Sequence, residues 1–492
     1  MQRCLTSALA LASLTSRARA APAAEWRGRA IYQVLTDRFA APQSPACEDI
    51  RSYCGGTWAA LAGRLDYIQA LGFDAVWVSP VVDNAPGGFH GYWQRRMHDA
   101  NANFGAWEDV RALADALHAR GMFLMVDVVA NHAWASGGDV SANEPFNSTA
   151  QYHDCNGCPN GCSVDDYEDH AQMEHCRLAG LMDFDNTDTA GPVATELFEW
   201  AAFLVNATNA DGLRVDTVPY VLPAFWRRFE AAAGVYCVGE VDTGDLNFAA
   251  PYQVGAANAF EGGALSGVLS YPLFFTLRSV FAQRQSMRAL GSAWRAAAAA
   301  WGDPSLLGVF TDNHDNARWL SGGSVDVVAY RAALAYSILS DGIPIVYYGT
   351  EWLFDGGNDP ENREAFWLTH GASYDAAAAP LGSFLAALLR YRRSARLWDA
   401  DAAQLERWQD DYFYAFTKGD GVIAAFTNGG AAGGDQARDV TYLPAAWPPG
   451  TRLCSPLDCT VCATVAAGPV LRVTVKAAEG YVVLDPRVAQ CA

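Results

Sequence analysis

Residues 212–218, Gly-Leu-Arg-Val-Asp-Thr-Val, place an arginine and a carboxylate two positions apart at the end of a short apolar run. Side chains two apart in a strand point to the same side, so Arg214 and Asp216 would share one face. A guanidinium beside a carboxylate lowers the pKa of that carboxyl group and keeps it ionised, as a nucleophile requires. An isolated pair of this kind is more often a surface ion pair at the end of a strand.

Two further acidic segments each follow an apolar run of their own. Residues 235–241 end with Gly-Glu-Val around Glu240, and residues 308–316 contain Asp-Asn-His-Asp-Asn with Asp315 at its fourth position. If these runs are neighbouring parallel strands, their carboxyl ends meet at one edge of the sheet. The sequence therefore predicts that three carboxylates gather at one rim.

The elements that must position these groups alternate between short β-rich runs and amphipathic helical patterns. We predict strands over residues 30–35, 75–79, 123–129, 212–215, 236–241, 267–271, 307–311 and 343–348. Helices are predicted over residues 58–71, 106–120, 192–206, 223–233 and 325–340, with an alanine-rich helix at 296–300. Eight such units predict an α/β protein with a (β/α)8 TIM barrel, whose chemistry lies at the carboxyl ends of the strands.

Two regions depart from this alternation. Residues 132–188 are rich in Gly, Asn, Asp and Cys and have weak periodicity, which predicts an irregular subdomain inserted after the third strand. After about residue 396 the pattern becomes short strands at 412–417, 422–427, 440–443, 471–475 and 481–484, which predicts a C-terminal antiparallel β-sandwich. The expected organisation is a signal peptide at 1–20, the barrel at 21–131 and 189–395, the insertion at 132–188 and the sandwich at 396–492.

Composition limits the partners of the chain. Its 492 residues carry a formal net charge of −20, with a pI near 4.8, which argues against nucleic acid and anionic membranes. The 16 Trp supply aromatic planes that can stack on the apolar faces of sugar rings, although most Trp in any protein belong to the core. A neutral substrate is the easier match. No later apolar run approaches the ~20 residues of a membrane span, so the mature protein is expected to be soluble.

The N-terminus and the cysteines predict export. A basic residue, a modest apolar stretch and Ala18-Arg19-Ala20 are typical of a secretory signal cleaved after about Ala20, although a transit peptide shares some of these features. Cysteines that cluster in loops indicate disulfides of an oxidising compartment. The alternative is a zinc site at Cys155, Cys158 and Cys162 with nearby histidines. Cys237 lies in an apolar run and is expected to be a free buried thiol, and two N-glycosylation sequons begin at Asn147 and Asn206.

Four segments in a fixed order resemble the sequence regions of the α-amylase family of glycoside hydrolases. They are residues 127–132 (DVVANH), 212–218, 239–241 and 313–316 (NHDN). The likeness extends to residues 31–39, 54–58, 90–93 and 357–364, is greatest to the secreted fungal-type α-amylases, and covers nearly the whole chain from Trp26, weakening after about Arg396.

The resemblance implies a role for each of the three carboxylates. Cleavage with retention of configuration needs a nucleophile and an acid/base, typically ~5 to 5.5 Å apart. The resemblance makes Asp216 the nucleophile and Glu240 the acid/base, whose pKa apolar surroundings and a neighbouring negative charge would raise. Asp315 would accept hydrogen bonds from sugar hydroxyls that strengthen in the transition state.

The resemblance also implies a set of substrate-binding residues. Without it, each histidine would be read as a core or strand-end residue, and residues 357–364 as a solvated loop. With it, histidines donate to sugar hydroxyls and aromatic rings stack on the sugar. The implied set is Arg214, His132, His314, His90, Tyr92, Trp93, Asp359 and Arg363.

A structural calcium ion (Ca2+) is implied in the same way. A hard cation prefers oxygen ligands and could fix a loop-rich insertion to the barrel. The family site matches Asn131, Glu174 and Asp183, with a backbone carbonyl from the position of Tyr220. Without the resemblance, Glu174 and Asp183 would be ordinary surface acids.

The chain departs from the fungal-type pattern in two places near the cleft. Pro219 and Tyr220 stand where that pattern has Lys-His, which removes donors on the leaving-group side, and the loop at 81–89 is short. By position, Cys47 is expected to pair with Cys54, Cys162 with Cys176 and Cys459 with Cys491. We further expect the pairs Cys155 with Cys158 and Cys454 with Cys462.

Taken together, the resemblance predicts a secreted, retaining α-amylase that binds calcium and cuts internal α-1,4-glucosidic bonds of starch, glycogen and maltooligosaccharides. It is expected to be a monomer without nucleic-acid or membrane partners. The nearest alternative is an α-glucosidase or α-glucan transferase of the same family, because the catalytic trio is shared. A non-catalytic glycan-binding homologue is the alternative from another class, although such relatives tend to lose a carboxylate and this chain keeps all three.

Overall fold

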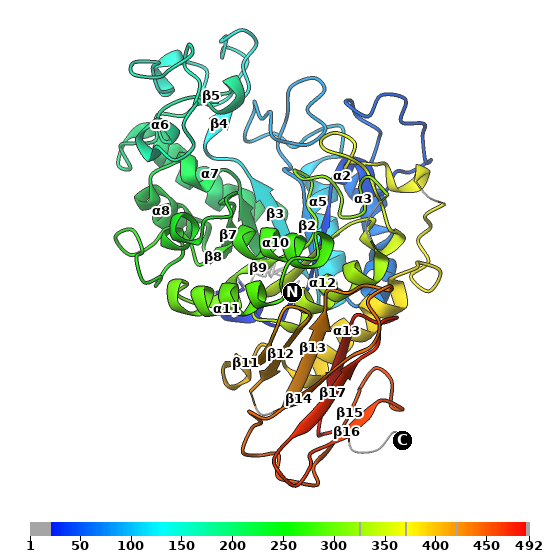
Figure 1. The fold of residues 1–492 in the computed structure, drawn as a ribbon. Helices are drawn as coiled ribbons and strands as arrows, with labels where there is room; N and C mark the ends of the chain where they lie inside the picture. The colour runs from blue at the N-terminus through cyan, green and yellow to red at the C-terminus, as the bar shows by residue number, and fades with distance from the viewer. Residues whose placement is uncertain (1–20, 324–325, 370, 420, 489–492) are drawn as a thin grey trace, which may run out of the picture.

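A parallel sheet of eight strands forms the centre of the molecule (Figure 1). The computed structural model describes residues 21–323, 326–369, 371–419 and 421–488, so the predicted signal peptide lies outside the described residues. Neighbours in the sheet follow the order β8-β7-β6-β3-β2-β1-β10-β9, and an isolated parallel bridge between Leu269 and Gly308 joins the two end strands. The strands are β1 (Ile31–Val34), β2 (Ala75–Val78), β3 (Phe123–Val128), β6 (Gly212–Val215), β7 (Tyr236–Gly239), β8 (Gly267–Val268), β9 (Gly308–Val309) and β10 (Ile343–Tyr347). The predicted TIM barrel is confirmed.

Helices surround this sheet, and their ends follow from the sequence. Two of them begin with proline, which lacks the N–H that a first helical turn leaves unbonded, and end at Asn209 and Gly234 in the left-handed conformation. The predicted helix at 58–71 is divided in two at Gly63 and Arg64. The main helices are α3 (Trp58–Ala62), α4 (Leu65–Ala70), α5 (Trp107–His118), α7 (Pro192–Thr208), α8 (Pro223–Ala233), α10 (Tyr271–Leu277), α11 (Arg288–Ala300), α12 (Val327–Leu339) and α13 (Gly382–Ala395). The short ones are α1 (Ala23–Trp26), α2 (Thr36–Phe39), α6 (His170–Met173) and α9 (Leu246–Ala249).

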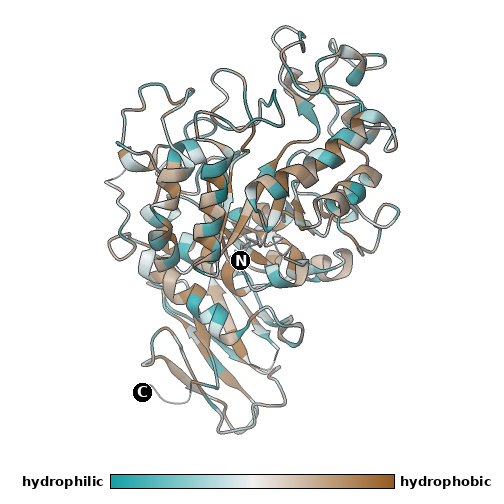
Figure 2. Cartoon of the chain, turned by 180° about the vertical axis from the view of Figure 1, so that it is seen from behind, coloured by the Kyte–Doolittle hydropathy of each residue, from teal (hydrophilic) through white to brown (hydrophobic). Residues whose placement is uncertain are grey.

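Alternation along the strands divides the core into two layers. Ile343 and Ile345 of β10 belong to the cluster inside the barrel, whereas Val346, which points to the opposite side, belongs to the cluster between strands and helices. The strands are accordingly among the most apolar segments of the chain (Figure 2). Trp26 of α1 is fully buried against the inner cluster, and its indole N–H lies 3.3 Å from the carbonyl oxygen of Asp211.

The segment between β3 and β6 is an irregular insertion. Its strands β4 (His132–Ala133) and β5 (Met182–Asp183) pair antiparallel. Two disulfides join Cys155 with Cys162 and Cys158 with Cys176. The predicted pairs Cys155 with Cys158 and Cys162 with Cys176 are wrong, because a turn through Asn160, Gly161 and Cys162, all at positive φ, brings Cys162 back to Cys155. The zinc alternative is also wrong, since its three thiols are oxidised.

The C-terminal region is antiparallel, as predicted. One sheet orders β11 (Gln404–Gln409), β12 (Phe413–Lys418), β13 (Val422–Thr427) and β18 (Tyr481–Leu484), and β14 (Gln436–Val440) pairs with β17 (Leu471–Val475). A disulfide between Cys454 and Cys462 links the paired strands β15 (Arg452–Cys454) and β16 (Cys462–Thr464), as expected. The strand predicted at 440–443 instead ends at Val440. Cys491 lies outside the described residues, so its predicted pairing with Cys459 stays a prediction.

The C-terminal sheets are attached to the barrel through polar contacts at a buried seam. The Tyr391 hydroxyl donates to Asp485 at 2.7 Å, and Lys418 of β12 pairs with Asp341 in front of β10. The seam therefore fixes one sheet against the amino-terminal side of the barrel strands. Among the described residues, no helix has the length and apolar character needed to cross a membrane.

Replacing Trp26 tests how much the inner cluster depends on α1. We expect Trp26→Ala to lower the free energy of unfolding by about 3–5 kcal/mol, because the lost indole leaves a cavity that a barrel cannot close. Chemical denaturation followed by circular dichroism measures the change. Trp26→Phe is the matched control and should cost less than half as much. A Trp26→Ala variant within about 1 kcal/mol of wild type would contradict this account.

Candidate active site

Three carboxylates, two of them predicted, lie at the carboxyl ends of the neighbouring strands β3, β6 and β7. Asp127 is opposite Arg214 in the register of β3 and β6, and Arg214 is opposite Val238 of β7. The Asp216 N–H donates to the carbonyl of Val128 at 3.0 Å, which continues the ladder past the last strand residue. The sheet order thus brings Asp127, Asp216 and Glu240 together from three adjacent strands.

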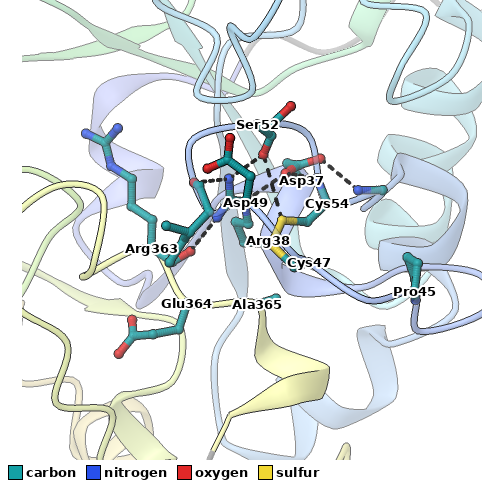
Figure 3. Close-up of a disulfide and its surroundings, with 12 residues drawn as sticks. Asp37, Arg38, Pro45, Cys47, Asp49, Ser52, Cys54, Arg363, Glu364 and Ala365 are labelled. Carbon is teal, nitrogen blue, oxygen red and sulfur yellow. Dashed lines mark hydrogen bonds and ion pairs between the residues drawn. A yellow bond between two sulfur atoms is a disulfide. The ribbon is translucent and has the colours of Figure 1, made fainter.

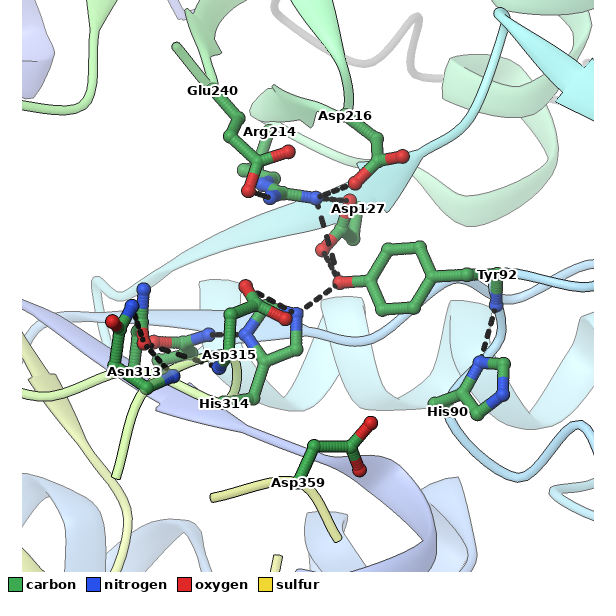
Figure 4. Close-up of polar contacts among 12 residues, drawn as sticks. His90, Tyr92, Asp127, Arg214, Asp216, Glu240, Asn313, His314, Asp315 and Asp359 are labelled. Carbon is green, nitrogen blue, oxygen red and sulfur yellow. Dashed lines mark hydrogen bonds and ion pairs between the residues drawn. The ribbon is translucent and has the colours of Figure 1, made fainter. Parts of the chain in front are cut away.

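One buried guanidinium holds these three carboxylates (Figure 4). Arg214 Nη1 donates to Asp216 at 2.7 Å and to Asp127 at 2.9 Å, and its Nη2 lies 3.0 Å from Glu240 Oε1. The pair inferred from spacing is confirmed. Asp127 was absent from the predicted site residues, although its place at the end of the neighbouring predicted strand could have indicated it.

Burial sets the protonation of the two central carboxyl groups. It raises the pKa of Asp216 to about 6, because loss of solvation outweighs the opposing field of Arg214. The expectation of a lowered pKa was therefore right about the effect of Arg214 and wrong about the balance. Burial, reinforced by the negative charges of Asp216 and Asp315, raises the pKa of Glu240 to about 8. Burial therefore favours the protonated form of Glu240 more strongly than that of Asp216.

A backbone turn after Asp216 aims an amide at Glu240. Thr217 has φ of 51°, in the left-handed region, and its N–H donates to Glu240 Oε2 at 3.1 Å. The Tyr271 hydroxyl lies 3.4 Å from the other oxygen, Oε1. Both oxygens of Glu240 are thus oriented by protein groups.

Tyr92 connects this cluster to His314. Its hydroxyl lies 2.7 Å from Asp127 Oδ2 and 2.6 Å from His314 Nε2, and the second ring nitrogen of His314 is 2.9 Å from the amide nitrogen of Gln33. Burial, with the fields of Arg363 and Arg214, lowers the pKa of His314 well below its usual value, so the ring is neutral. His314 Nε2 also lies 3.3 Å from Asp315.

The other predicted ring residues form one group around the Tyr92 backbone. His90 Nδ1 accepts from the Tyr92 N–H at 3.0 Å, and His132 Nε2 lies 3.1 Å from the Tyr92 carbonyl oxygen. Burial lowers the pKa of His90 to about 3 and that of His132 to about 4. Trp93, at 36% exposure, is the most accessible of this group.

Arg363 brings the distant loop at 357–364 to the cluster. Its guanidinium lies 2.9 Å from Asp359 and 3.5 Å from Asp315, and its Nε donates to the His314 carbonyl at 3.0 Å. Contacts through Tyr92, His90 and Arg363 therefore connect the eight predicted substrate-binding residues to the carboxylate cluster.

The loop that follows β1 contacts the backbone of Arg363 (Figure 3). Buried Arg38 donates to the Arg363 carbonyl at 3.0 Å and to the carbonyl of Ser52 at 2.7 Å. Asp37 pairs with Arg38 and accepts from the Cys54 N–H at 2.8 Å. The disulfide between Cys47 and Cys54, which was predicted, closes this loop.

Three of the four predicted calcium ligands converge beside the insertion. One end of the Asn131 amide lies 3.1 Å from the carbonyl oxygen of Tyr220 and 3.0 Å from Asp183 Oδ1. If the amide oxygen of Asn131 lies at that end, three oxygens face one another, and a hard cation among them would remove their repulsion. If the amide nitrogen lies there, it can donate hydrogen bonds to both oxygens without a cation. Glu174 directly follows α6, which packs against the turn at Val218–Tyr220. This donor set fits calcium.

A criterion based only on His, Cys, Asp and Glu side chains does not identify this site. In the described ranges, His, Cys, Asp and Glu form no group of three or more arranged to hold a metal. The candidate cluster contains one amide and one backbone carbonyl, so only two of its four donors are acidic side chains. His153 Nδ1 lies 2.5 Å from the second oxygen of Asp183 and orients that carboxylate.

Comparisons with known proteins agree with this geometry. The family description "Alpha amylase, catalytic domain" matches residues 33–382. The chain is 34% identical to "Alpha-amylase" of Saccharomycopsis fibuligera, over 99% of each chain. It is 42% identical to "Alpha-amylase 1" of Lipomyces kononenkoae, over 70% of this chain and 56% of that relative's length. The solved α-amylase of Malbranchea cinnamomea superposes with a TM-score of 0.85 at 38% identity, covering 95% of this chain and 98% of that one.

Calcium binding can be tested through stability. A ligand that binds only the native state stabilises it by about 2.7 kcal/mol at 100 times its Kd, so we expect a chelator to lower the thermal midpoint and added calcium to restore it. In Asp183→Asn the chelator should have little effect. Asp165→Asn, an exposed carboxylate of the same insertion, is the control and should respond as wild type does. An unchanged wild-type midpoint, with metal removal verified by elemental analysis, would rule the site out.

Proposed function

The chain belongs to the α-amylase family of glycoside hydrolases, and from this premise we propose that it is a secreted, retaining α-amylase that cleaves internal α-1,4-glucosidic bonds of starch and glycogen. The observation that carries the proposal is the single buried guanidinium of Arg214, which contacts Asp216 at 2.7 Å and Glu240 at 3.0 Å, while burial raises the pKa of Glu240 further than that of Asp216. A retaining glycosidase needs that combination of nucleophile and acid at neutral pH.

In the proposed reaction, Glu240 donates its proton to the glycosidic oxygen while Asp216 attacks the anomeric carbon. The bond from that carbon to the leaving oxygen breaks, and a covalent glycosyl-enzyme forms with Asp216. Glu240, now a carboxylate, then takes a proton from water. The water oxygen attacks the anomeric carbon, releases Asp216 and restores the original configuration.

The surrounding side chains would bind and distort the sugar. Asp315 would accept hydrogen bonds from sugar hydroxyls, which strengthen as the ring approaches the oxocarbenium-like transition state. Trp93 offers an exposed aromatic face. The remaining binding groups in this proposal are Arg214, His132, His314, His90, Tyr92, Asp359 and Arg363.

Calcium would act as a structural tie in this mechanism. Asn131 and Tyr220 belong to segments at the barrel rim, whereas Glu174 and Asp183 belong to the insertion, so one ion held by all four would fix the insertion beside the cleft. When bound, the ion would neutralise charge among these oxygens, and its place in this proposal is structural. Export is supported by the disulfides of the described chain, which form in oxidising compartments.

The products formed from soluble starch test the function. An internal-cleaving hydrolase should abolish the iodine colour rapidly and release short maltooligosaccharides. Glucose released alone from chain ends would instead identify an α-glucosidase, and cyclic or lengthened glucans would identify a transferase. Either result would overturn the proposal.

Two isosteric substitutions test the assigned roles. Asp216→Asn removes the nucleophile and Glu240→Gln removes the acid/base, so each should lower kcat on maltoheptaose by about 10²-fold to 10⁴-fold or more. Asp435→Asn, an exposed carboxylate of the C-terminal region, is the control and should keep wild-type activity. Wild-type hydrolysis by Asp216→Asn or Glu240→Gln would show that the assignment is wrong.

The pH dependence of kcat/KM follows from the two pKa values. Activity requires ionised Asp216, so it should fall as pH drops through about 6. It also requires protonated Glu240, so it should fall as pH rises through about 8. The expected bell-shaped profile gives two apparent pKa values that belong to the pair, because the two groups interact. The range from pH 5 to pH 9 extends about one unit beyond each pKa. A kcat/KM that stays constant over this range would contradict the expected profile.

A further inference from the structure

A fully buried arginine, Arg38, contacts two distant segments that carry proposed substrate-binding groups. It lies in α2, directly after β1, and belongs neither to the carboxylate cluster nor to the proposed binding residues. We propose that Arg38 is a positioning residue for hydrolysis, which holds Arg363 and His90 in place against the disulfide-closed loop at 47–54. This inference rests on the proposed function, from which it takes the binding roles of Arg363 and His90.

The donors of Arg38 are divided between two loops (Figure 3). Its Nη1 donates to the carbonyl oxygen of Arg363 at 3.0 Å. Its Nη2 donates to the carbonyl oxygens of Ile50 at 2.8 Å and Ser52 at 2.7 Å. Because the guanidinium is a rigid planar fork, it fixes the backbone at residue 363 at a set distance from the backbone at residues 50–52.

The loop on one side of Arg38 is itself constrained. The disulfide between Cys47 and Cys54 closes it, and both carbonyl groups that Arg38 contacts lie between these two cysteines. The two oxygens of Asp37 accept from the Cys54 N–H at 2.8 Å and from the Gly55 N–H at 3.1 Å. Asp37 also pairs with Arg38 at 2.7 Å. The loop is therefore a fixed support for the guanidinium.

On the other side, Arg38 holds the backbone from which the Arg363 side chain extends. That side chain lies 3.5 Å from Asp315 and 2.9 Å from Asp359, and its Nε donates to the carbonyl oxygen of His314 at 3.0 Å. A shift of the backbone at residue 363 would therefore displace the cation beside Asp315. In the proposed function, Asp315 binds sugar hydroxyls most strongly in the transition state.

Arg38 also contacts the segment that carries His90. Its guanidinium carbon lies 3.8 Å from the centroid of the buried Phe89 ring, a cation–π distance, and the Phe89 ring meets the His90 ring edge to face at 5.3 Å. His90 in turn accepts from the Tyr92 N–H at 3.0 Å. One side chain thus contacts both segments, 89–92 and 363, although they come from opposite ends of the barrel sequence.

These contacts predict an effect on placement rather than on charge. Arg38 is already paired with Asp37, and Arg38→Lys keeps the positive charge while it removes the fork. A small displacement of binding groups far from the reacting bond can cost up to about 100-fold in rate. Interactions that strengthen in the transition state lower kcat more than they raise KM when they are lost.

The Arg38→Lys variant tests the proposal. We expect its kcat on maltoheptaose to fall about tenfold to 100-fold, with KM changed by less than about threefold. The limbs of its pH profile should stay where they are in wild type, because the Arg214 cluster is untouched.

Arg392→Lys is the matched control. Arg392 is also a buried arginine that donates to backbone carbonyls, those of Ile338 at 2.9 Å and Gly342 at 2.7 Å, but Gly342 lies at the amino end of β10, away from the active site. It should keep the wild-type kcat. A wild-type kcat in Arg38→Lys, or an equal loss of kcat in Arg392→Lys, would overturn the positioning role.

Two double variants test the support without changing Arg38. Cys47→Ser with Cys54→Ser opens the loop and should lower kcat by at least about threefold. Cys454→Ser with Cys462→Ser removes a disulfide of similar sequence separation in the C-terminal region and should keep the wild-type kcat. Equal kcat values in the two double variants would overturn the proposal, and this comparison decides if circular dichroism shows that Arg38→Lys does not fold.

The wild-type protein separates failure of this inference from failure of the proposed function. Absence of maltoheptaose hydrolysis by the wild-type protein would overturn the function on which the binding roles rest. Wild-type hydrolysis together with an unchanged kcat in Arg38→Lys would overturn the positioning role alone.

Discussion

The ion pairs of Arg214 are the interaction on which the rest of the site depends. One buried guanidinium contacts carboxyl groups from three adjacent strands, those of Asp127, Asp216 and Glu240, and compensates the charge of those that are ionised. Without it, burial of these charges would be prohibitive, because an unpaired buried ion costs several kcal/mol. Burial is nevertheless incompletely compensated, and this imbalance keeps the carboxyl pKa values near neutrality, where proton transfer is useful.

Much of the fold could be predicted because the barrel strands are short apolar runs separated by amphipathic helical patterns. The eight predicted strands all occur, with ends displaced by a few residues. The insertion was harder, because its structure depends on long-range crosslinks. The pairing of Cys155 with Cys162 depends on the positive-φ turn at Asn160, Gly161 and Cys162, which spacing alone does not determine. Likewise, the periodicity of residues 58–71 does not indicate that the helix predicted there is divided at Gly63.

The candidate site was predictable as a set of residues and less so as a set of contacts. The spacing of Arg214 and Asp216 indicated their pairing, and the family motifs indicated Glu240 and Asp315. Nothing in the local sequence showed that Tyr92 would join Asp127 to His314, because these residues come from three separate segments. The balance between burial and charge at Asp216 also depends on the depth of the barrel rim, which is a property of the assembled fold.

The conformation of Thr217 shows how the requirements of the site and of the fold diverge. A β-branched residue in the left-handed region is strained by about 1–3 kcal/mol, and the same turn directs its N–H to Glu240. The chain therefore stores conformational energy between its two central carboxylates. A sequence optimised for stability alone would have glycine or asparagine at this position. Thr217 is therefore a compromise between the stability of the fold and the fixed orientation of Glu240.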